Sequence, residues 1–319
     1  MEIETTDYHT AGEPFRIVTG GGPRLLGDSI LARRRDAREN HDAIRRLLVN
    51  EPRGHADMYG CFVTEPNDAG ADLGVVFFHN DGYSTACGHG TIALVTWALE
   101  SGRLALQEPL TRVVVDVPSG RLDTVARVES GKVRSVLFRN VPSFVLEPAV
   151  TVGRFTAAVA FGGAFYAIVP AAQAGLKVEP RHLPQLIDLG RGLKQHLEAE
   201  LTVVHPLEPE LRDIYGVIFT DGDRNVTIFA NGEVDRSPCG SGTSARLALL
   251  DATGELKRGE DLRHVSIIDT EFRGRVVGAT EVAGRPAVIT EVEGSAYLTG
   301  HHRFLLDDAD PLGIGFLLR

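Results

Sequence analysis

The chain carries CGHGTIA at residues 87–93 and repeats the pattern as CGSGTSA at residues 239–245, one copy in each half of its 319 residues. Both copies read Cys-Gly-x-Gly-Thr-x-Ala. Each is followed by an apolar stretch that ends at a glycine, Gly102 or Gly254, where a helix would end with a positive φ. Segments 12–18 and 162–168 form a second echo, with a glycine, a phenylalanine and a β-branched residue in register. The sequence therefore predicts a duplicated unit with one thiol in each half.

The apolar stretches behind the two motifs predict helices at 91–101 and 243–253. Apolar residues surround the first helix on nearly every side, which is typical of a helix buried inside its half. Strand-like runs dominate the rest of the chain, at 75–79, 112–117, 132–141, 215–220, 226–230 and 287–292. We therefore expect an α+β fold of two similar halves, each a barrel of strands wrapped around a central helix, with the active site between them.

Length and the repeat together predict the domain organisation. A chain of 319 residues exceeds the size at which one hydrophobic core usually stops growing. The repeat places the boundary near the middle, so we expect a first half at 1–145 carrying Cys87 and a second half at 146–319 carrying Cys239. We leave open that the C-terminal tail packs on the first half.

Composition excludes several classes of protein. No apolar run approaches the ~20 residues that span a bilayer, and the N-terminus lacks the features of a secretion signal, so we expect a soluble cytoplasmic protein. A net charge of −10 is unsuited to nucleic acid, whose phosphates require a basic surface. Three cysteines without Cys-x-x-Cys argue against a disulfide framework or a zinc ribbon, and histidines show no metal-ligand spacing. We expect no metal, no membrane and no nucleic acid.

The motif chemistry follows from where each cysteine stands. A thiol at a helix N-terminus faces unpaired backbone N–H groups and the positive end of the helix dipole, which lower its pKa from ~8.5 toward ~3.5–7.5. The glycines let backbone amides approach an anion, so two such motifs would hold one carboxylate. Thiols on opposite faces of an α-carbon would remove and return its proton. The competing interpretation is that cysteine and glycine only allow tight packing, and we favour it for Cys61.

The residues around both motifs resemble the proline racemase family. The match includes DRSPCGSGT at 235–243, DYHTAGEP at 7–14, EPRGH at 51–55, DMYG at 57–60 and DADPL at 308–312. This family comprises proline racemases, hydroxyproline 2-epimerases and trans-3-hydroxy-L-proline dehydratases. The resemblance implies enzymes without a cofactor and a fold similar to diaminopimelate epimerase, with the small-molecule substrate, proline or hydroxyproline, between two α+β halves. A homodimer is left open.

Roles for individual residues follow from the same resemblance. Cys87 and Cys239 would be the acid/base pair. Backbone amides would hold the substrate carboxylate at Gly88, His89, Gly240 and Ser241. His89 and Asp235 would lie near the ring nitrogen, and Phe229 and Tyr59 would be aromatic walls against the ring. The alternatives are purely structural roles, in which His89 forms hydrogen bonds only with nearby backbone and Asp235 caps the beginning of the helix.

The second cysteine bears on which reaction is catalysed. Dehydratases of this family commonly carry threonine at that position, because elimination of a β-hydroxyl needs only one base. Cys239 therefore favours a racemase or epimerase, an isomerase. Segments 31–35, 77–84 and 161–166 look more like the dehydratase branch, which keeps a hydro-lyase as the alternative. Two other classes fit less well: a pyridoxal phosphate racemase lacks a lysine in a motif, and a binding protein without activity has no need of both thiols.

Overall fold

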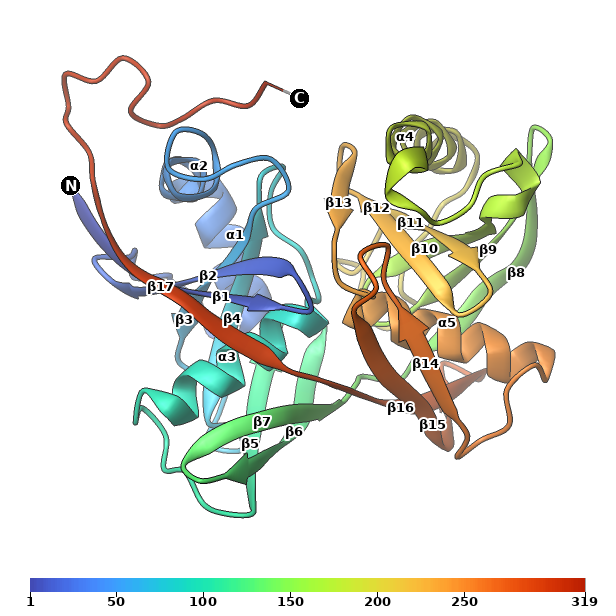
Figure 1. Cartoon of the computed structure of the whole chain (residues 1–319), viewed down its shortest axis with the longest axis horizontal. Coiled ribbons are helices and arrows are strands. Elements are labelled where there is room, and N and C mark those ends of the chain that lie inside the picture. Colours follow the sequence, from blue (N-terminus) through green and yellow to red (C-terminus); the bar gives the residue numbers. More distant parts are fainter. Residues whose placement is uncertain (319) are drawn as a thin grey trace. The chain divides into compact units, whose positions relative to one another are not determined.

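The computed structural model describes residues 1–318. Backbone contacts divide the chain into two compact units (Figure 1). Unit 1 is Met1–Val136 together with the segment from Ser295 onwards, and unit 2 is Leu137–Gly294. These units are defined by backbone contacts alone, and the domain assignment 1–145 and 146–319 stays a prediction.

Unit 1 is a mixed α/β unit in which strands outnumber helices among the described residues. Its strands are β1 (Glu2–Thr10), β2 (Glu13–Gly20), β3 (Tyr59–Thr64), β4 (Leu73–His79), β5 (Leu110–Val117), β6 (Gly120–Glu129) and β17 (Ala296–Leu305). Its helices are α1 (Ile30–Asn40), α2 (Asp42–Val49) and α3 (Gly88–Glu100). Strand β7 (Lys132–Arg139) contains the boundary between the units.

Unit 2 is built in the same way. Its strands are β8 (Phe144–Val152), β9 (Phe155–Phe161), β10 (Phe165–Pro170), β11 (Ile214–Asp221), β12 (Arg224–Phe229), β13 (Glu233–Asp235), β14 (Asp261–Val265), β15 (Glu271–Val282) and β16 (Arg285–Gly294). Its helices are α4 (Leu183–Glu200) and α5 (Gly240–Thr253), with the short 3-10 turns η1 (Ala171–Ala174) and η2 (Pro180–His182) before α4.

The strand pairings reveal the duplication. In unit 1, β1–β2 is antiparallel, β2–β3 parallel, β3–β4 antiparallel, β4–β5 parallel and β5–β6 antiparallel. In unit 2, the same alternation runs through β9, β10, β11, β12, β14 and β15. The late strand β17 pairs with β1, and β8 pairs with β9 in the same way. The two units therefore share one sequence of strand pairings, which confirms the predicted fold of two similar halves.

Each unit contains one buried helix. Helix α3 is buried from Gly88 to Leu99 and packs on β1, β2, β3, β6 and β17 (Figure 1). Helix α5 is buried from Gly240 to Ala248 and packs on β8, β9, β10, β15 and β16. Both helices begin earlier than predicted, because the motif glycines adopt helical geometry instead of ending the preceding loop. Truncating a fully buried side chain such as Leu94 to alanine would cost about 2–5 kcal/mol of unfolding free energy.

Both helices end as the sequence predicts. Gly102 has φ 76° just after α3, and Gly254 has φ 74° at the end of α5. Beyond α3, the Arg103 guanidinium lies over the Trp97 ring, 5.9 Å from its centroid. In residues 1–318, no helix combines the length and the apolar character that crossing a membrane requires.

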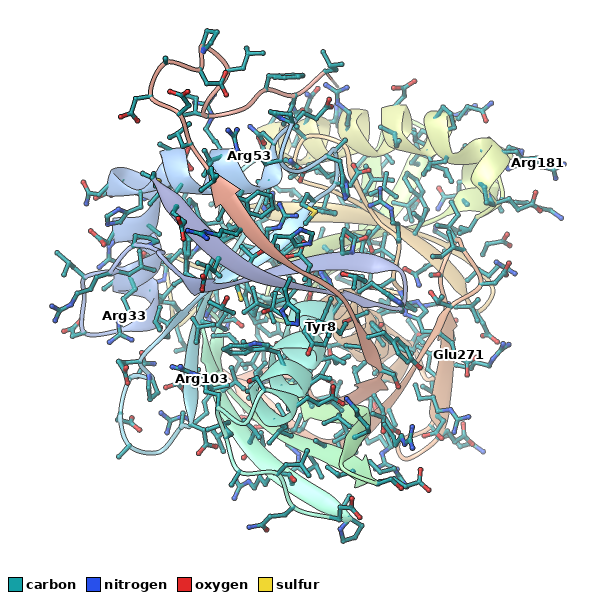
Figure 2. All side chains as sticks on the ribbon, turned by 60° about the vertical axis from the view of Figure 1, so that its left-hand side comes forward. Tyr8, Arg33, Arg53, Arg103, Arg181 and Glu271 are labelled. Atoms are coloured by element: carbon teal, nitrogen blue, oxygen red, sulfur yellow. The ribbon has the colours of Figure 1, made fainter. Side chains whose placement is uncertain are left out.

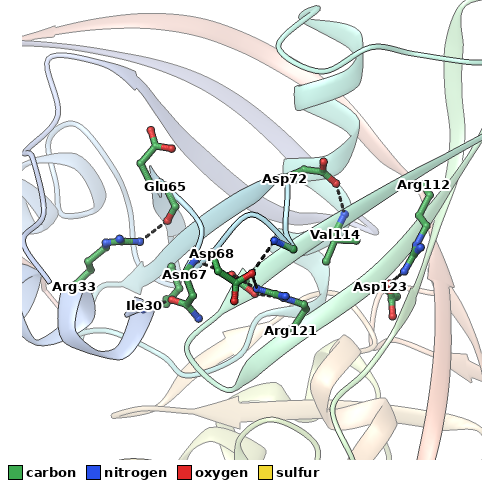
Figure 3. A network of polar contacts seen from close by, with 12 residues as sticks. Ile30, Arg33, Glu65, Asn67, Asp68, Asp72, Arg112, Val114, Arg121 and Asp123 are labelled. Carbon is green, nitrogen blue, oxygen red and sulfur yellow. Dashed lines mark hydrogen bonds and ion pairs between the residues drawn. The ribbon is translucent and has the colours of Figure 1, made fainter. Parts of the chain in front are cut away.

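Polar contacts fix the loop between β3 and β4. The buried Asp116 carboxylate accepts from the N–H of Asn67 at 2.8 Å and from the Arg121 guanidinium at 2.8 Å. Arg121 also binds Asp68, and Asp72 accepts from the N–H of Val114, so that both ends of the loop are held (Figure 3). The loop that follows β3 is thus tied to β5 and to Arg121 on β6.

A buried arginine ties the 48–53 segment to β1. Arg16 forms a buried ion pair with Asp7 at 2.8 Å and donates to the carbonyls of Leu48 and Arg53. Arg53 lies near the C-terminal segment (Figure 2), and its side chain donates to the carbonyls of Leu305 and Gly313. The segment before β3 and the C-terminal segment of unit 1 are therefore held by the same two guanidinium groups.

Candidate active site

The first motif places a sulfur atom at the beginning of α3. Cys87 is the N-cap residue, with extended backbone (φ −154°), and its Sγ accepts a hydrogen bond from the N–H of Gly90 at 3.2 Å. Thr91 closes the turn, since both its N–H and its hydroxyl donate to the Cys87 carbonyl at 2.9 Å. The thiol therefore lies where the helix presents unpaired N–H groups and partial positive charge.

The second glycine of each motif is required by the position of sulfur. A Cβ atom at Gly90 would lie 2.6 Å from Cys87 Sγ and even closer to the Phe15 ring. A Cβ atom at Gly242 would lie 2.9 Å from Cys239 Sγ. Both distances are shorter than real side chains tolerate. The second glycine of Cys-Gly-x-Gly therefore provides the space that the sulfur atom occupies beside the first turn of the helix.

Aromatic rings surround the first thiol. The His89 ring nitrogens lie 3.5 and 3.6 Å from Cys87 Sγ. The His89 ring packs edge to face on Phe15, at 5.7 Å between centroids, and on Tyr59, at 4.9 Å. Burial lowers the pKa of His89 to about 3, so its imidazole is neutral at neutral pH. In that form it has one N–H donor and one acceptor nitrogen.

Tyr59 completes this group from the start of β3. It is buried, and its hydroxyl donates to Ser84 Oγ at 2.5 Å. Its ring also lies 5.4 Å from the His79 ring. The structure therefore brings Tyr59, Cys87, Gly88 and His89 together in unit 1, where Gly88 is the first residue of α3. The role of Tyr59 as a wall against a substrate ring stays a prediction.

The second motif has a different backbone. Cys239 precedes α5 with φ 63°, a left-handed conformation that costs a residue with a side chain free energy. A short polar bracket holds this turn. Asp235 Oδ1 accepts from the N–H of Ser237 at 2.8 Å and from its hydroxyl at 2.7 Å, and Ser237 Oγ accepts from the N–H of Cys239 at 3.1 Å. Asp235 thus fixes the strained turn at the beginning of the helix.

The sulfur of Cys239 contacts a tyrosine hydroxyl. Its Sγ lies 3.6 Å from the hydroxyl of Tyr166 on β10, and that hydroxyl is 2.6 Å from Ser241 Oγ. Burial, and then the neighbouring Asp235 charge, raise the pKa of Cys239 to about 12. The expectation of a lowered pKa is therefore wrong for this thiol, because desolvation and a like charge outweigh the helix N-terminus. Burial also raises the pKa of Asp235, to about 6.

The remaining predicted residues of unit 2 lie in the same neighbourhood. Gly240 and Ser241 are the first two residues of α5. Phe229 at the end of β12 stacks on Tyr215 with centroids 5.4 Å apart, and Tyr215 packs edge to face on Tyr166 at 5.7 Å. Phe229 is therefore part of an aromatic group that reaches the residue beside Cys239. Its role against a substrate ring stays a prediction.

Sequence reasoning missed several residues that contact the motifs, among them Phe15, Tyr166 and Ser237. The echo between 12–18 and 162–168 contains the first two, but in the sequence it indicates only a duplication. Ser237 lies inside the quoted DRSPCGSGT stretch. Segments 12–18 and 162–168 are separated by nearly the same distance in the sequence as the two cysteines, and this was the signal that could have indicated Phe15 and Tyr166.

Other candidate side chains have structural surroundings. Cys61 is fully buried in β3, and burial raises the pKa of its thiol. His301 lies 3.2 Å from the Thr6 hydroxyl, and His302 lies 3.4 Å from Asp7. Across residues 1–318, no group of three or more His, Cys, Asp and Glu side chains is arranged to hold a metal ion.

The family can now be assigned by comparison. The model of the proline racemase family matches residues 5–317. The chain belongs to the proline racemase family. It is 46% identical to a trans-3-hydroxy-L-proline dehydratase from Bacillus cereus over 98% of this chain and 97% of that protein. It is also 46% identical to a 3-hydroxyproline 2-epimerase from Burkholderia multivorans, over 99% and 98%.

A solved structure supports the fold of this family member. The crystal structure of a hydroxyproline epimerase from Agrobacterium vitis, with bound trans-4-hydroxy-L-proline, superposes with a TM-score of 0.93 and 35% identity, covering 99% of this chain and 96% of that chain. The predicted family and fold class are confirmed. The predicted enzyme class, a racemase or epimerase with a hydro-lyase as alternative, is confirmed at the level of the family.

The steric role of glycine predicts the effect of Gly90→Ala. The added Cβ would overlap Cys87 Sγ, so we expect the free energy of unfolding to fall by about 1–3 kcal/mol in chemical denaturation. Gly192→Ala is the control. It lies on α4 with open space around its Cα, and we expect that substitution to raise the free energy of unfolding by about 0.5–1 kcal/mol. Equal stability of the two variants would contradict the steric argument.

The charge beside Cys239 predicts the effect of Asp235→Asn. The amide keeps the oxygen that accepts from Ser237 but removes the negative charge, so the pKa of Cys239 should fall. We expect iodoacetamide to alkylate Cys239 faster at pH 8.5, as measured by mass spectrometry of the labelled peptide. Asp213→Asn, which neutralises an exposed carboxylate of the same unit, should leave the rate unchanged. A slower or unchanged rate in Asp235→Asn would show that this charge does not control the thiol.

Proposed function

We propose that the chain is a cofactor-independent racemase or 2-epimerase of proline or hydroxyproline. In this proposal Cys87 and Cys239 transfer protons at the α-carbon of the substrate. The observation that carries it is the presence of two buried thiols, each at the N-terminus of a buried helix and each beside glycine. Inversion needs a base on one face of the carbon and an acid on the other, whereas elimination needs only one base.

The helix N-termini would hold the substrate carboxylate. Each motif offers backbone N–H groups in the first turn of its helix, at Gly88 and His89 in α3 and at Gly240 and Ser241 in α5. Such N–H groups, together with the helix dipole, favour an anion. A carboxylate held in this way fixes the α-carbon and lowers the entropy cost of proton transfer.

The two thiols have different surroundings, which supports a division of labour in the resting enzyme. Cys87 Sγ already accepts the N–H of Gly90, a contact that stabilises a thiolate. The pKa of Cys239 is raised to about 12, so this thiol keeps its proton at neutral pH. We therefore assign Cys87 as the base and Cys239 as the acid for the first half of a turnover. After inversion the two have exchanged roles.

His89 and Asp235 would bind the ring nitrogen. At neutral pH the Asp235 carboxylate, with a pKa of about 6, is mostly charged and pairs with a secondary ammonium. The neutral imidazole of His89 accepts a second N–H without adding positive charge. This pairing keeps the ring nitrogen protonated, and the positive charge on that nitrogen makes the α-proton more acidic.

The dehydratase remains the alternative function. The identity to the Bacillus cereus trans-3-hydroxy-L-proline dehydratase equals that to the Burkholderia multivorans 2-epimerase, both 46%. In the alternative, Cys87 removes the α-proton and the 3-hydroxyl leaves. A product analysis separates the two reactions.

Proton NMR in D₂O tests the proposed function directly. Proline and each isomer of 3- and 4-hydroxyproline are incubated with the protein without added metal or cofactor. For at least one substrate we expect the α-proton signal to disappear while a new stereoisomer forms, seen as a diastereomer for the hydroxyprolines and on a chiral column for proline. Loss of the ring spectrum with formation of a keto or imine product would identify the dehydratase instead. Retention of every α-proton would contradict both.

Replacement of the second thiol tests the division of labour. Cys239→Thr should abolish inversion, because no acid remains on the second face of the α-carbon. Cys87 would still remove a proton from its own face, so dehydration of trans-3-hydroxy-L-proline should equal or exceed that of the parent. Cys87→Ser should lose both activities, and Cys61→Ser should keep them. A Cys239→Thr protein that still interconverts stereoisomers would place the second proton donor elsewhere.

A further inference from the structure

Tyr166 occupies an unusual position in unit 2. Its side chain is fully buried on β10, and its hydroxyl lies between two partners, Cys239 Sγ at 3.6 Å and Ser241 Oγ at 2.6 Å. We propose that Tyr166 is a catalytic residue, whose hydroxyl stabilises the thiolate form of Cys239 by a hydrogen bond that Ser241 supports. This inference rests on the proposed function of Cys239 as one of the two acid/base groups.

The hydrogen count at this hydroxyl gives the mechanism. A tyrosine has one O–H proton and donates to one partner at a time. When Cys239 is a thiol, its S–H donates to Tyr166 Oη, and Tyr166 donates to Ser241 Oγ. When Cys239 has given its proton to the substrate carbanion, Tyr166 Oη–H turns to the thiolate, and Ser241 Oγ–H donates to Tyr166. Only O–H bonds rotate, and both hydroxyl groups keep their protons.

The two half-sites differ in the donors that face each sulfur. Cys87 Sγ accepts a backbone N–H from Gly90 at 3.2 Å, a donor fixed by the helix. Cys239 has φ 63° and makes no cap hydrogen bond of that geometry, although the Gly242 N–H and the Thr227 hydroxyl lie close enough to its sulfur to act against the rise in its pKa. A thiolate there is buried beside the Asp235 carboxylate, and among the donors that oppose these two effects the Tyr166 hydroxyl contributes most. A hydroxyl donor that turns toward the sulfur offsets part of the desolvation and the repulsion.

The surrounding residues hold the Tyr166 ring in place. Its backbone lies in the parallel pairing of β10 with β11, opposite Gly216. The Tyr215 ring packs edge to face on it with centroids 5.7 Å apart. Because the ring is fixed and buried, the hydroxyl is already in place when the charge on sulfur forms, and preorganised donors of this kind stabilise developing charge.

Tyr166→Phe removes the hydroxyl and keeps the ring. We measure the iodoacetamide alkylation rates of Cys239 and Cys87 separately, by mass spectrometry of their peptides at pH 8.5 in the full chain. Alkylation of Cys239 should slow by about tenfold, while that of Cys87 stays within about twofold. Turnover should also fall by about tenfold. Removing an oxygen opens space and would speed alkylation if access were limiting, so a slower rate reports loss of the hydrogen bond.

Two further variants keep the proposal falsifiable. Ser241→Ala should slow alkylation of Cys239 by about threefold, since it leaves Tyr166 without its supporting donor. Tyr83→Phe is the control: its buried hydroxyl donates to the Ala37 carbonyl in unit 1, and both alkylation rates should stay at the parent value.

The outcomes separate this inference from the proposed function. Unchanged alkylation of Cys239 in both Tyr166→Phe and Ser241→Ala would overturn the inference, as would full turnover in a folded Tyr166→Phe protein. If the parent exchanges no α-proton of any substrate, the proposed function fails. Slow alkylation of Cys239 in Tyr166→Phe would then still establish the hydrogen bond but not its role in catalysis.

Discussion

The contact between a cysteine sulfur and the first turn of a buried helix constrains the rest of this structure. Sulfur occupies the volume into which a side chain at Gly90 or Gly242 would project. The helix can begin there only because the second glycine of the motif has no side chain. In both motifs the next residue is a threonine, and its hydroxyl donates to the cysteine carbonyl. The strands of each unit pack around this helix, so the motif fixes both the core and the position of the thiol.

Similar sequences produce different environments at the two thiols. The first lies among aromatic rings beside a neutral His89 and a fixed N–H donor. The second lies in a strained turn held by Asp235, with the hydroxyl of Tyr166 as its side-chain partner. In the proposed mechanism, a single proton transfer across a substrate requires one thiol and one thiolate.

The sequence predicted the helices behind both motifs because an apolar stretch of this length, bounded by Cys-Gly and by a later glycine, is typical of a buried helix. It placed Asp235, Gly240 and Ser241 near Cys239 because they are neighbours in the chain. Tyr166 and Phe15 could not be placed in this way, since they reach the motifs through strand pairing. The raised pKa of Cys239 was also missed, because a local pattern indicates the helix dipole but not the burial and the charge that oppose it.

The proposed mechanism requires that one substrate reaches both thiols, and protection by a planar ligand tests this requirement most directly. Pyrrole-2-carboxylate is planar at C2, as the carbanion-like transition state is, and should bind tightly for that reason. We predict that saturating pyrrole-2-carboxylate slows the alkylation of Cys87 and of Cys239 together, with Cys61 as the internal control whose labelling does not change. Protection of only one of the two thiols, or of neither, would contradict the account.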